Sequence, residues 1–499
     1  MTAVQNKKER GTDMKALMKL IPAFLTLALL LALAAVPLSA AEPDYKYREI
    51  STEEELLKLS DDDHYDGNFI LTQDITLTKE HSISPIEFFD GTLNGNGHKI
   101  IGYKGAAPLF DVLGAAALIK NLTFEDAVVS GGSKVAMLVN TNKGTLWNLT
   151  FRNISVTGTG TDVAGVCYDN QASGRIEHID FEGTVTGNGD RAAGIVIHQR
   201  KDATLRYCTV RGKIESNFHV GGIASHLMGG AVMESCLNFA TVLARKSRAG
   251  GICATNVENS KIINCGNYGE VRAWREGDPN NSGALVAGIG ANEKTGFEFR
   301  NCFNAGKLIT KNTSTAIGGI CSYFNVTGDD IAKAFVNCYT VAGLLNRYTD
   351  DTATTTQPIG DTDLAAKATS GTVVPAEEWG TQAMVDKLGA GFVLTGDTNA
   401  PIGLAADTTP EPQPKVSEPE PTDEPTDEQT KEQETPTGAP TGESTQKPTD
   451  KPTGETEKET TGTPAANNAG CSSALGLGSI ALIAAAGVAA GALRKKKED

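Results

Sequence analysis

The sequence predicts an all-β protein, a single-stranded right-handed parallel β-helix (a solenoid) with short capping helices, followed by a disordered stalk and a C-terminal transmembrane helix. Three observations predict the solenoid: a repeat of about 29 residues, β-favouring stretches of only a few residues, and repeats rich in Gly, Asn and Thr. Such repeats are too short to form a core alone, so they must stack. The right hand follows from the usual hand of parallel crossovers.

A triplet of a small residue, a glycine and an aliphatic residue marks each repeat. Its glycines lie 29, 28, 29, 37 and 31 residues apart. In a parallel stack each repeat lies about 4.8 Å above the last, so equivalent side chains form columns. The triplets are Ala164-Gly165-Val166, Ala193-Gly194-Ile195, Gly221-Gly222-Ile223, Gly250-Gly251-Ile252, Ala287-Gly288-Ile289 and Gly318-Gly319-Ile320.

Five of the nine cysteines fall at one position of the repeat, although an odd number of cysteines in an exported protein would ordinarily suggest disulfides. We interpret them as core thiols, because parallel Cβ vectors make the disulfide dihedral hard to reach, with an isolated bridge as the alternative. Three asparagines two residues later predict a ladder, and four glycines beyond it are expected to supply a positive φ. These residues are Cys208, Cys236, Cys265, Cys302 and Cys338; Asn238, Asn267 and Asn304; Gly183, Gly212, Gly269 and Gly306.

The ends of the solenoid should carry caps. Residues 42–345 are assigned to the β-helix with its N-terminal cap, where a helix from Ser51 to Leu59 is predicted with Ser51 and Glu54 as a capping box. Residues 346–404 form the predicted C-terminal cap region, with a second helix from Thr381 to Leu388 before Gly389.

Both ends of the chain indicate export. Residues 1–41 are typical of a signal peptide, with an uncleaved anchor as the alternative and with Met1 or Met14 as the start. Residues 405–466, rich in Pro, Thr and Glu, predict a disordered stalk that carries most of the net charge of −16. Residues 467–499 predict a transmembrane anchor or a processed sorting tail, whose basic end places the domain outside the cell.

One stretch resembles a known superfamily. Residues 89–100 (Phe-Asp-Gly-Thr-Leu-Asn-Gly-Asn-Gly-His-Lys-Ile) are similar to the opening of pectin-lyase-like β-helix proteins, and residues 264–271 and 301–308 to GLUG-type repeats of bacterial, Clostridia-type surface proteins. The resemblance covers roughly residues 46–345, and Pro108 departs from it where a Gly is usual. It implies the β-helix architecture, while the superfamily includes both enzymes and adhesin-like binders.

Catalytic chemistry is not indicated by the sequence. Glycan hydrolysis needs carboxylates that converge on one face, and no persuasive set occurs. Asp61, Asp62 and Asp63, with Asp329 and Asp330, are interpreted as solvated loops, with a Ca²⁺ site at the first cluster as the alternative. We expect no cofactor. Because the folded part is mildly acidic, we also expect no nucleic-acid partner.

The most informative constellation comes from counting within the repeat. One column lies four residues after the glycines and contains Asp169, His198 and His226. The other lies three residues before the glycines and contains Asp162, Arg191, His219 and Arg248. If both columns face outward, they share one flank of the solenoid. That flank could bind an acidic or hydroxyl-rich glycan, or a metal through Asp169, His198 and His226, or simply be a solvated polar face.

The sequence therefore favours a membrane-anchored, cell-surface scaffold that binds a polysaccharide or a host or microbial surface protein in the manner of an adhesin, without catalysis. A polysaccharide lyase or glycoside hydrolase for acidic glycans and a passive envelope spacer remain as alternatives. Candidate ligand-binding residues are Asp169, Arg191, His198, His219, His226 and Arg248.

Overall fold

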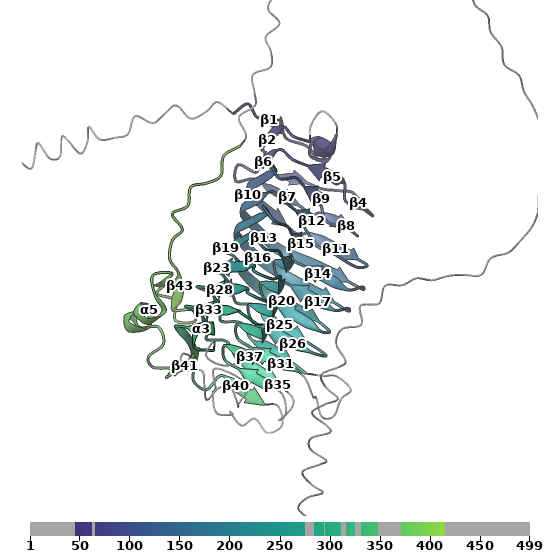
Figure 1. Ribbon diagram of the computed structural model, residues 1–499. Helices are drawn as coiled ribbons and strands as arrows, with labels where there is room; N and C mark the ends of the chain where they lie inside the picture. The colour runs from purple at the N-terminus through teal and green to yellow at the C-terminus, as the bar shows by residue number, and fades with distance from the viewer. Residues whose placement is uncertain are drawn as a thin grey trace, which may run out of the picture. The chain divides into compact units, whose positions relative to one another are not determined.

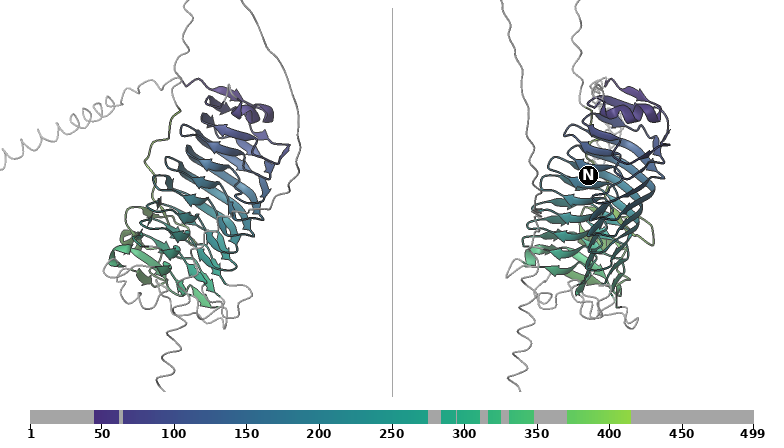
Figure 2. Two further views of the ribbon diagram at one scale, coloured as in Figure 1. Left: turned by 45° about the vertical axis from the view of Figure 1, so that its right-hand side comes forward. Right: turned by 90° about the vertical axis from the view of Figure 1, so that its right-hand side faces the viewer.

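The computed structural model describes residues 45–61, 65–274, 284–293, 295–310, 316–324, 331–347 and 371–414. Within them the chain winds as a parallel β-helix, in which each strand pairs in parallel with its equivalent in the next turn (Figure 1). The predicted solenoid is confirmed. The strands lie across the long axis in all three orientations (Figure 2).

Two of the parallel sheets consist of one short strand per turn. The first runs from β5 at the N-terminal end to β37, and the second from β14 to β36. The first contains β5 (Ile86–Phe89), β9 (Phe110–Leu113), β12 (Val139–Asn142), β15 (Cys167–Asn170), β18 (Val196–Gln199), β22 (Ala224–Leu227), β27 (Cys253–Asn256), β32 (Gly290–Glu293) and β37 (Cys321–Phe324). The second contains β14 (Asp162–Ala164), β17 (Arg191–Ala193), β21 (His219–Gly221), β26 (Arg248–Gly250), β31 (Leu285–Ala287) and β36 (Ala316–Gly318).

The remaining parallel strands form one large sheet, because its long central strands turn corners and join three stacks. The first stack holds β1 (Arg48–Ile50), β2 (Asn68–Leu71), β6 (Thr92–Asn94), β10 (Leu118–Glu125), β13 (Thr145–Gly158), β16 (Arg175–Gly187), β19 (Thr204–Arg206), β23 (Val232–Glu234), β28 (Lys261–Ile263), β33 (Glu298–Arg300) and β38 (Phe335–Val336). The second adds β3 (Ile75–Thr76), β7 (Lys99–Ile101), β20 (Thr209–Ser216), β24 (Leu237–Asn238), β29 (Gly266–Asn267), β34 (Phe303–Asn304), β39 (Cys338–Val341) and β41 (Gly371–Val374). The third adds β4 (Glu80–His81), β8 (Lys104–Gly105), β11 (Val128–Gly131), β25 (Thr241–Ala244), β30 (Val271–Ala273), β35 (Leu308–Thr310) and β40 (Leu345–Arg347).

The interior is filled by stacked columns of like residues, as predicted. The five equivalent cysteines are fully buried, and the thiols of Cys208, Cys236 and Cys265 contact one another in sequence. All eight cysteines of the described residues are free thiols, including a second set, Cys167, Cys253 and Cys321, on the sheet that starts at β5. The interpretation as core thiols is therefore confirmed for the described cysteines.

The predicted asparagine ladder is present and fully buried. The Asn238 Nδ2 atom donates to Asn267 Oδ1 at 2.8 Å, and Asn267 Nδ2 donates to Asn304 Oδ1 at 2.8 Å. A second buried ladder joins Asn142, Asn170 and Gln199 through amide hydrogen bonds of 2.8 Å each. The amides of these two ladders thus find partners in the adjacent turns, as buried polar groups usually do.

The glycines serve a different purpose from the one predicted at the turn. Of the four glycines beyond the ladder, only Gly212 has a positive φ, of 103°. A Cβ on Gly269 would lie 2.0 Å from the Ala240 carbonyl oxygen, and one on Gly306 would lie 2.0 Å from that of Gly269. The prediction of positive φ was therefore wrong for Gly183, Gly269 and Gly306, which are required by close backbone approach instead.

Positive φ belongs instead to a column of non-glycine residues at the corner between the first and second stacks of the large sheet. Asparagine is the most frequent residue in this column, because its short amide side chain tolerates the left-handed region of backbone conformation. The members are Asn96, Asn121, Asn148, His178, Tyr207, Ser235, Asn264, Asn301 and Asn337. Between neighbours the amides hydrogen-bond, as Asn148 Nδ2 does to Asn121 Oδ1 at 2.7 Å.

The N-terminal cap is a helix, α2 (Glu53–Leu57), continued by a 3₁₀ turn, η1 (Lys58–Ser60). The helix was predicted, but its capping box lies one residue later than expected: Thr52 is the N-cap and Glu55 closes the box. Leu56 and Leu59 are buried against the first turns and so cover the apolar end of the stack.

The C-terminal region also differs from expectation. The predicted helix exists as α5 (Gln382–Leu388), with Thr381 as N-cap and Gly389 as C-cap, but it packs on the side of the solenoid. Figure 1 shows α5 beside the solenoid, and its Met384 and Leu388 lie in a buried cluster with Leu237 of β24 and Phe303 of β34. The described residues also include α3 (Ile331–Ala334) and an antiparallel pair, β42 (Phe392–Leu394) with β43 (Ile402–Leu404).

Residues 405–414, which we assigned to the stalk, lie against the solenoid. They carry no helix or strand, yet they run from β43 along its outer side toward the N-terminal turns (Figures 1 and 2). Their contacts span several turns, from His178 to Lys120. We call residues 405–414 the strap. The predicted boundary at 405 therefore does not coincide with the end of the packed structure.

Several predictions lie outside the described residues: the signal peptide (1–41), most of the stalk (415–466) and the C-terminal anchor (467–499). In the part of the chain that the structure describes, no helix combines the length and apolar character required to cross a bilayer.

Candidate functional site

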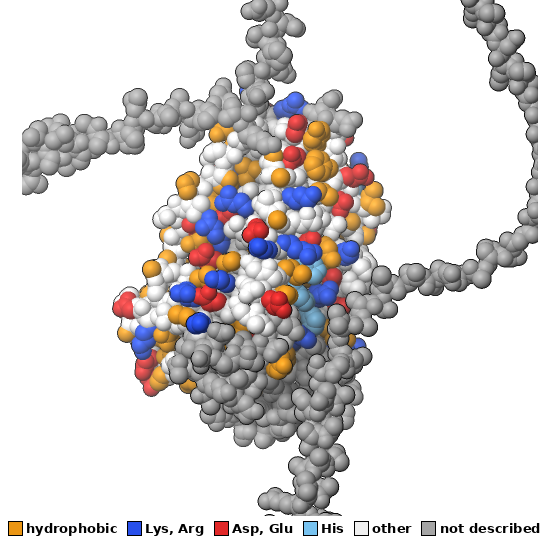
Figure 3. All heavy atoms as spheres, viewed as in Figure 1, with side chains coloured by type: hydrophobic (Ala, Val, Ile, Leu, Met, Phe, Trp, Pro, Cys, Tyr) orange, Lys and Arg blue, Asp and Glu red, His pale blue; other side chains and the backbone are white. Residues whose placement is uncertain are grey.

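The two predicted polar columns lie on neighbouring sheets that meet at the glycine triplets. Parallel register aligns Asp162, Arg191, His219 and Arg248 on β14, β17, β21 and β26. It likewise aligns Asp169, His198, His226 and Thr255 on β15, β18, β22 and β27. We call these eight residues the polar flank. Histidine side chains lie among basic and acidic ones where β14 and β17 run (Figure 3).

The glycine triplets allow the two columns to approach. A Cβ on Gly222 would lie 2.0 Å from the Gly251 carbonyl oxygen and 2.5 Å from the Asn238 amide carbon. Gly251 and Gly288 pack in the same way on Asn267 and Asn304. The corner is therefore pressed onto the buried asparagine ladder, which explains why the triplet and the ladder recur together.

The columns converge across this corner. The His219 and His226 rings, one from each column, have centroids 5.2 Å apart, and the His198 and His226 rings lie 5.8 Å apart. Arg248 Nη1 is 3.5 Å from Thr255 Oγ1, again across the corner. The prediction that the two columns share one flank is confirmed, but several members are shielded: Asp162 is 2% exposed and His226 is 9% exposed.

Some charged residues of the polar flank form ion pairs, whereas Arg248 does not within the described residues. Arg191 Nη1 lies 3.0 Å from Asp162 Oδ1, and Arg200 Nε lies 2.7 Å from Asp169 Oδ1. Arg248 makes no ion pair within the described residues, and burial lowers its pKa to about 10, an effect that the charge of Glu293 partly opposes. Because that pKa stays well above neutrality, Arg248 remains charged. Together with the adjacent Arg200, the polar flank therefore has three guanidinium groups against two carboxylates.

The three histidines are uncharged at neutral pH. Burial, followed by the charges of Arg248 and Arg191, lowers the pKa of His219 to about 3. Burial and the neighbouring basic groups also lower the pKa values of His198 and His226. Neutral imidazoles beside guanidinium groups avoid a costly accumulation of buried positive charge.

The hydrogen bonds of Ser225 assign the tautomer of His226. The Ser225 hydroxyl donates to the His219 carbonyl at 3.0 Å, so it can only accept from His226 Nδ1, which lies 3.2 Å away. The proton of the neutral ring is therefore on Nδ1, and Nε2 is left as an acceptor. The polar flank thus offers an acceptor beside the guanidinium donors.

Four buried nitrogen atoms of the polar flank have no hydrogen-bond partner within the described residues. They are Arg191 Nε, Arg248 Nε, His198 Nδ1 and His219 Nδ1. Unpaired buried polar atoms are uncommon and costly in proteins, so each of them calls for an explanation.

Sequence reasoning missed two parts of this site. Arg200 pairs with Asp169 across one turn, and Tyr168 contributes an aromatic ring whose centroid lies 5.4 Å from that of His198. The Lys134 ammonium lies 5.6 Å from the Tyr168 ring centroid. Tyr168 directly precedes Asp169, so a search for aromatic residues beside the polar columns would have found it.

Metal binding and hydrolytic catalysis find little support at the polar flank. Among the described residues, no three His, Cys, Asp or Glu side chains are grouped so that they could hold a metal ion, which argues against the metal reading of Asp169, His198 and His226. Both flank carboxylates hold a guanidinium and are not free as acid and base. The clusters at Asp62–His64 and Asp329–Asp330 lie outside the described residues.

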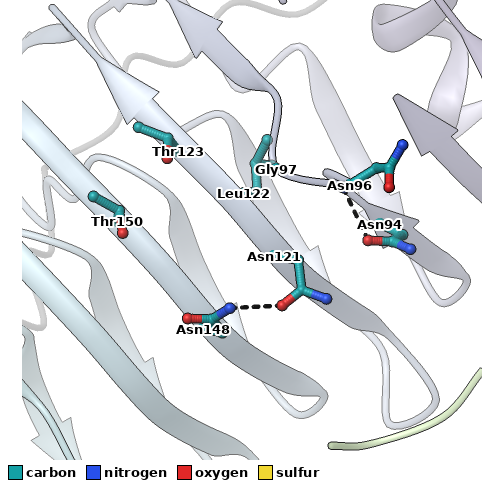
Figure 4. Close-up of a pocket in the computed structure, with 8 residues that line it drawn as sticks. All are labelled: Asn94, Asn96, Gly97, Asn121, Leu122, Thr123, Asn148 and Thr150. Atoms are coloured by element: carbon teal, nitrogen blue, oxygen red, sulfur yellow. Dashed lines mark hydrogen bonds between the residues drawn. The ribbon is translucent and has the colours of Figure 1, made fainter. Parts of the chain in front are cut away.

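Away from the polar flank, a shallow groove of ≈ 400 Å³ lies on the large sheet near the N-terminal end (Figure 4). Asn94, Asn96, Asn121 and Asn148 line it with Thr123 and Thr150, from adjacent turns. Asn121 Nδ2 donates to Glu411 Oε1 at 2.8 Å, so the strap reaches one side of the groove.

Comparisons with known proteins do not assign a function to the chain. No family model matches the chain. It is 40% identical over 95 residues to halomucin of Haloquadratum walsbyi, a match that covers 18% of this chain and 1% of halomucin. It is similar to an immunoglobulin A1 protease candidate from Bacteroides ovatus (TM-score 0.38, 16% identity, 72% of this chain and 93% of that one) and to an IgA1 protease (TM-score 0.43, 15% identity, 75% and 26%). At such scores neither similarity bears on function.

Proposed function

We propose that the protein is a non-catalytic scaffold, displayed at a cell surface, whose polar flank binds an acidic or hydroxyl-rich glycan, free or on a surface protein. The observation that carries the proposal is Arg248, a charged and largely buried guanidinium without an ion-pair partner among the described residues, beside the Arg191 and His219 nitrogens that also lack partners. A carboxylate or sulfate group would supply a counter-charge for the Arg248 guanidinium through charge-assisted hydrogen bonds.

The neighbouring groups suit a sugar. The Nε2 atom of His226 can accept from a hydroxyl group, and Tyr168 offers an aromatic face beside His198. Because the flank repeats from turn to turn, it matches a polymer with regularly spaced groups better than a compact ligand.

The finer assignment to GLUG-type, pectin-lyase-like surface proteins forms part of this proposal, together with export through residues 1–41 and membrane attachment through residues 467–499. Its support is in the sequence: the motifs at residues 89–100, 264–271 and 301–308, the apolar ends and the basic tail.

The test is binding of the full-length protein to a glycan array that contains polyuronates, sulfated glycans and neutral glycans. We expect binding to acidic members and at least about a tenfold loss for Arg248→Gln, because one charged hydrogen bond contributes about 1.5–3 kcal/mol. The combined change of Arg191, His198 and His226 should abolish binding. Arg300→Gln, an exposed arginine on β33, is the matched control.

Circular dichroism and thermal melting of each variant establish that it remains folded. Turnover of a polyuronate, with or without Ca²⁺, would contradict the proposal of a non-catalytic binder and would favour a lyase or hydrolase. If the protein binds no surface polymer or protein, the binding proposal is wrong, and the passive envelope spacer is the remaining hypothesis.

A further inference from the structure

The strap is attached to the solenoid by two acidic side chains four residues apart. Asp407 and Glu411 each meet basic or amide groups of the corner column that begins at Asn96. No strand pairing attaches the strap within the described residues. The Ala405 N–H donates to the Gly391 carbonyl at 2.9 Å, and beyond it side chains of the strap and the solenoid make the contacts. This is the pattern of a bound peptide rather than of an added strand.

The Glu411 contact centres on a buried lysine. The Lys120 side chain is only 5% exposed, and its Nζ lies 2.8 Å from Glu411 Oε1 and 3.2 Å from the Pro412 carbonyl oxygen. Asn121 donates to the same carboxylate at 2.8 Å. Within the described residues, the strap supplies the carboxylate that pairs with Lys120. A covered ammonium without such a partner is strongly unfavourable, so a segment that covers Lys120 as the strap does must bring an anion.

The histidine that contacts Asp407 packs between aromatic side chains. His178 Nε2 lies 2.9 Å from Asp407 Oδ2, and Arg206 Nη2 lies 3.6 Å from the same oxygen. The His178 ring is stacked on Tyr207, with centroids 5.1 Å apart and planes 6° from parallel, and it contacts Trp147 at 4.4 Å. The imidazole is therefore held in place before the carboxylate arrives.

Both carboxylates are stabilised in their charged form. Burial raises the pKa of Asp407. Hydrogen bonds from Thr409 and His178 and the charge of Arg206 outweigh this effect, so the pKa lies below its usual value. For Glu411, burial likewise raises the pKa, and Lys120 and Asn121 outweigh it.

We propose that this side of the solenoid is a receptor site for extended acidic peptides with the pattern Asp-x-x-x-Glu-Pro, and that residues 407–412 occupy it in cis. The site is distinct from the polar flank, and a peptide supplied by another protein binds once the strap leaves. The preformed Lys120, His178 and Arg206 positions supply specificity for two carboxylates at this spacing, and the strap lowers the apparent affinity by competition at a high effective concentration.

The experiment uses the full-length protein and a fluorescent peptide of residues 405–414. We expect no measurable binding to the wild type and saturable binding to Asp407→Asn/Glu411→Gln, whose own strap is weakened. Adding Lys120→Met to that variant, or replacing both acids of the peptide by amides, should weaken binding at least about tenfold. Glu378→Gln, which removes an exposed carboxylate near α5, is the matched control and should behave as wild type.

Hydrogen exchange of residues 405–414 makes each outcome decisive. Unchanged protection in the Asp407→Asn/Glu411→Gln variant would show that the carboxylates do not hold the strap, which overturns the proposal. Loss of protection without peptide binding would also overturn it, because the vacated surface would then have no affinity of its own. Failure at the polar flank leaves this result unaffected, since no residue is shared.

Discussion

Side chains that repeat at one position of a solenoid share one environment, and the cysteines illustrate this. Burial raises the pKa of Cys208, Cys265 and Cys302, so these thiols stay protonated and unreactive in the folded chain. The column could be predicted because spacing alone places equivalent residues above one another. The second set, at Cys167, Cys253 and Cys321, escaped prediction because other residues interrupt it.

Thiol accessibility tests this packing directly. In a Cys471→Ser variant, the native protein should show no fast-reacting thiol toward Ellman's reagent, and denaturant should release eight. Cys471 is replaced because it lies outside the described residues. Rapid reaction of one or more thiols before unfolding would contradict the buried columns.

The histidines of the polar flank predict a dependence of stability on pH. The folded-state pKa of His219 is about 3, against an ordinary value of 6.5, so the unfolded chain binds more protons between these values. Stability is therefore complete above pH 6.5 and falls as pH decreases toward 3, by at most about 1.4 kcal/mol per pH unit for this residue. Urea unfolding of His219→Gln between pH 7 and pH 4 should show a shallower decline.

The control for that measurement is Val232→Ala, a change at an exposed residue that has no titratable group, and this variant should retain the wild-type slope. An unaltered slope in His219→Gln would mean that His219 titrates as an exposed imidazole. The positions of the flank histidines followed from the repeat, whereas their burial depends on how closely the glycine corner approaches the ladder, which spacing does not encode.

Among the elements, α5 was predicted in its bounds but not in its location. Its apolar residues are spaced to form one face of a helix, yet that face is equally compatible with covering the end of the stack or its side. The deciding partners are Leu237 and Phe303, which look like ordinary strand residues in the sequence. The N-terminal capping box shows a similar limit, since Ser51-Glu54 and Thr52-Glu55 have the same spacing and the burial of Leu56 selects the second.

The packing of this lateral element can be tested at Phe392, which is 2% exposed and lies 5.5 Å from the Phe303 ring. Phe392→Ala should cost about 3–5 kcal/mol locally by leaving a cavity. We expect hydrogen exchange to rise across residues 382–394 while β13, β16 and β20 stay protected. Val393→Ala, at the exposed neighbour, is the control. Equal loss of protection throughout would show that the lateral element and the stack unfold as one unit.

For the whole molecule, the repeat made the architecture predictable and the polar corner locatable, because a parallel stack transmits register from one turn to the next. Features outside the repeat, including Arg200, the lateral helix and the strap, were not predictable in this way. The strap in particular has the composition of a disordered spacer, and only Asp407 and Glu411 distinguish it by meeting fixed partners.

A solenoid of this kind should show nearly independent energetics at distant turns. Asn170→Ala and Asn304→Ala each break a buried ladder and should each cost about 1–3 kcal/mol. The double variant should equal the sum within about 0.5 kcal/mol, measured by urea unfolding. Asn267→Ala with Asn304→Ala, which are hydrogen-bonded neighbours, should deviate from additivity; equal behaviour of both pairs would contradict nearest-neighbour coupling.

The return path of the strap decides where tension enters the molecule. A pull on the chain beyond residue 414 would reach the Glu411–Lys120 pair before it reaches β43, α5 or the last turn. The force would be applied at β10, toward the opposite end of the stack, and the C-terminal turns would be spared from peeling until that pair breaks. Unfolding under a pulling force should accordingly begin with detachment of the strap, which lengthens the chain by a short step. Whole turns of the solenoid should unfold only after that.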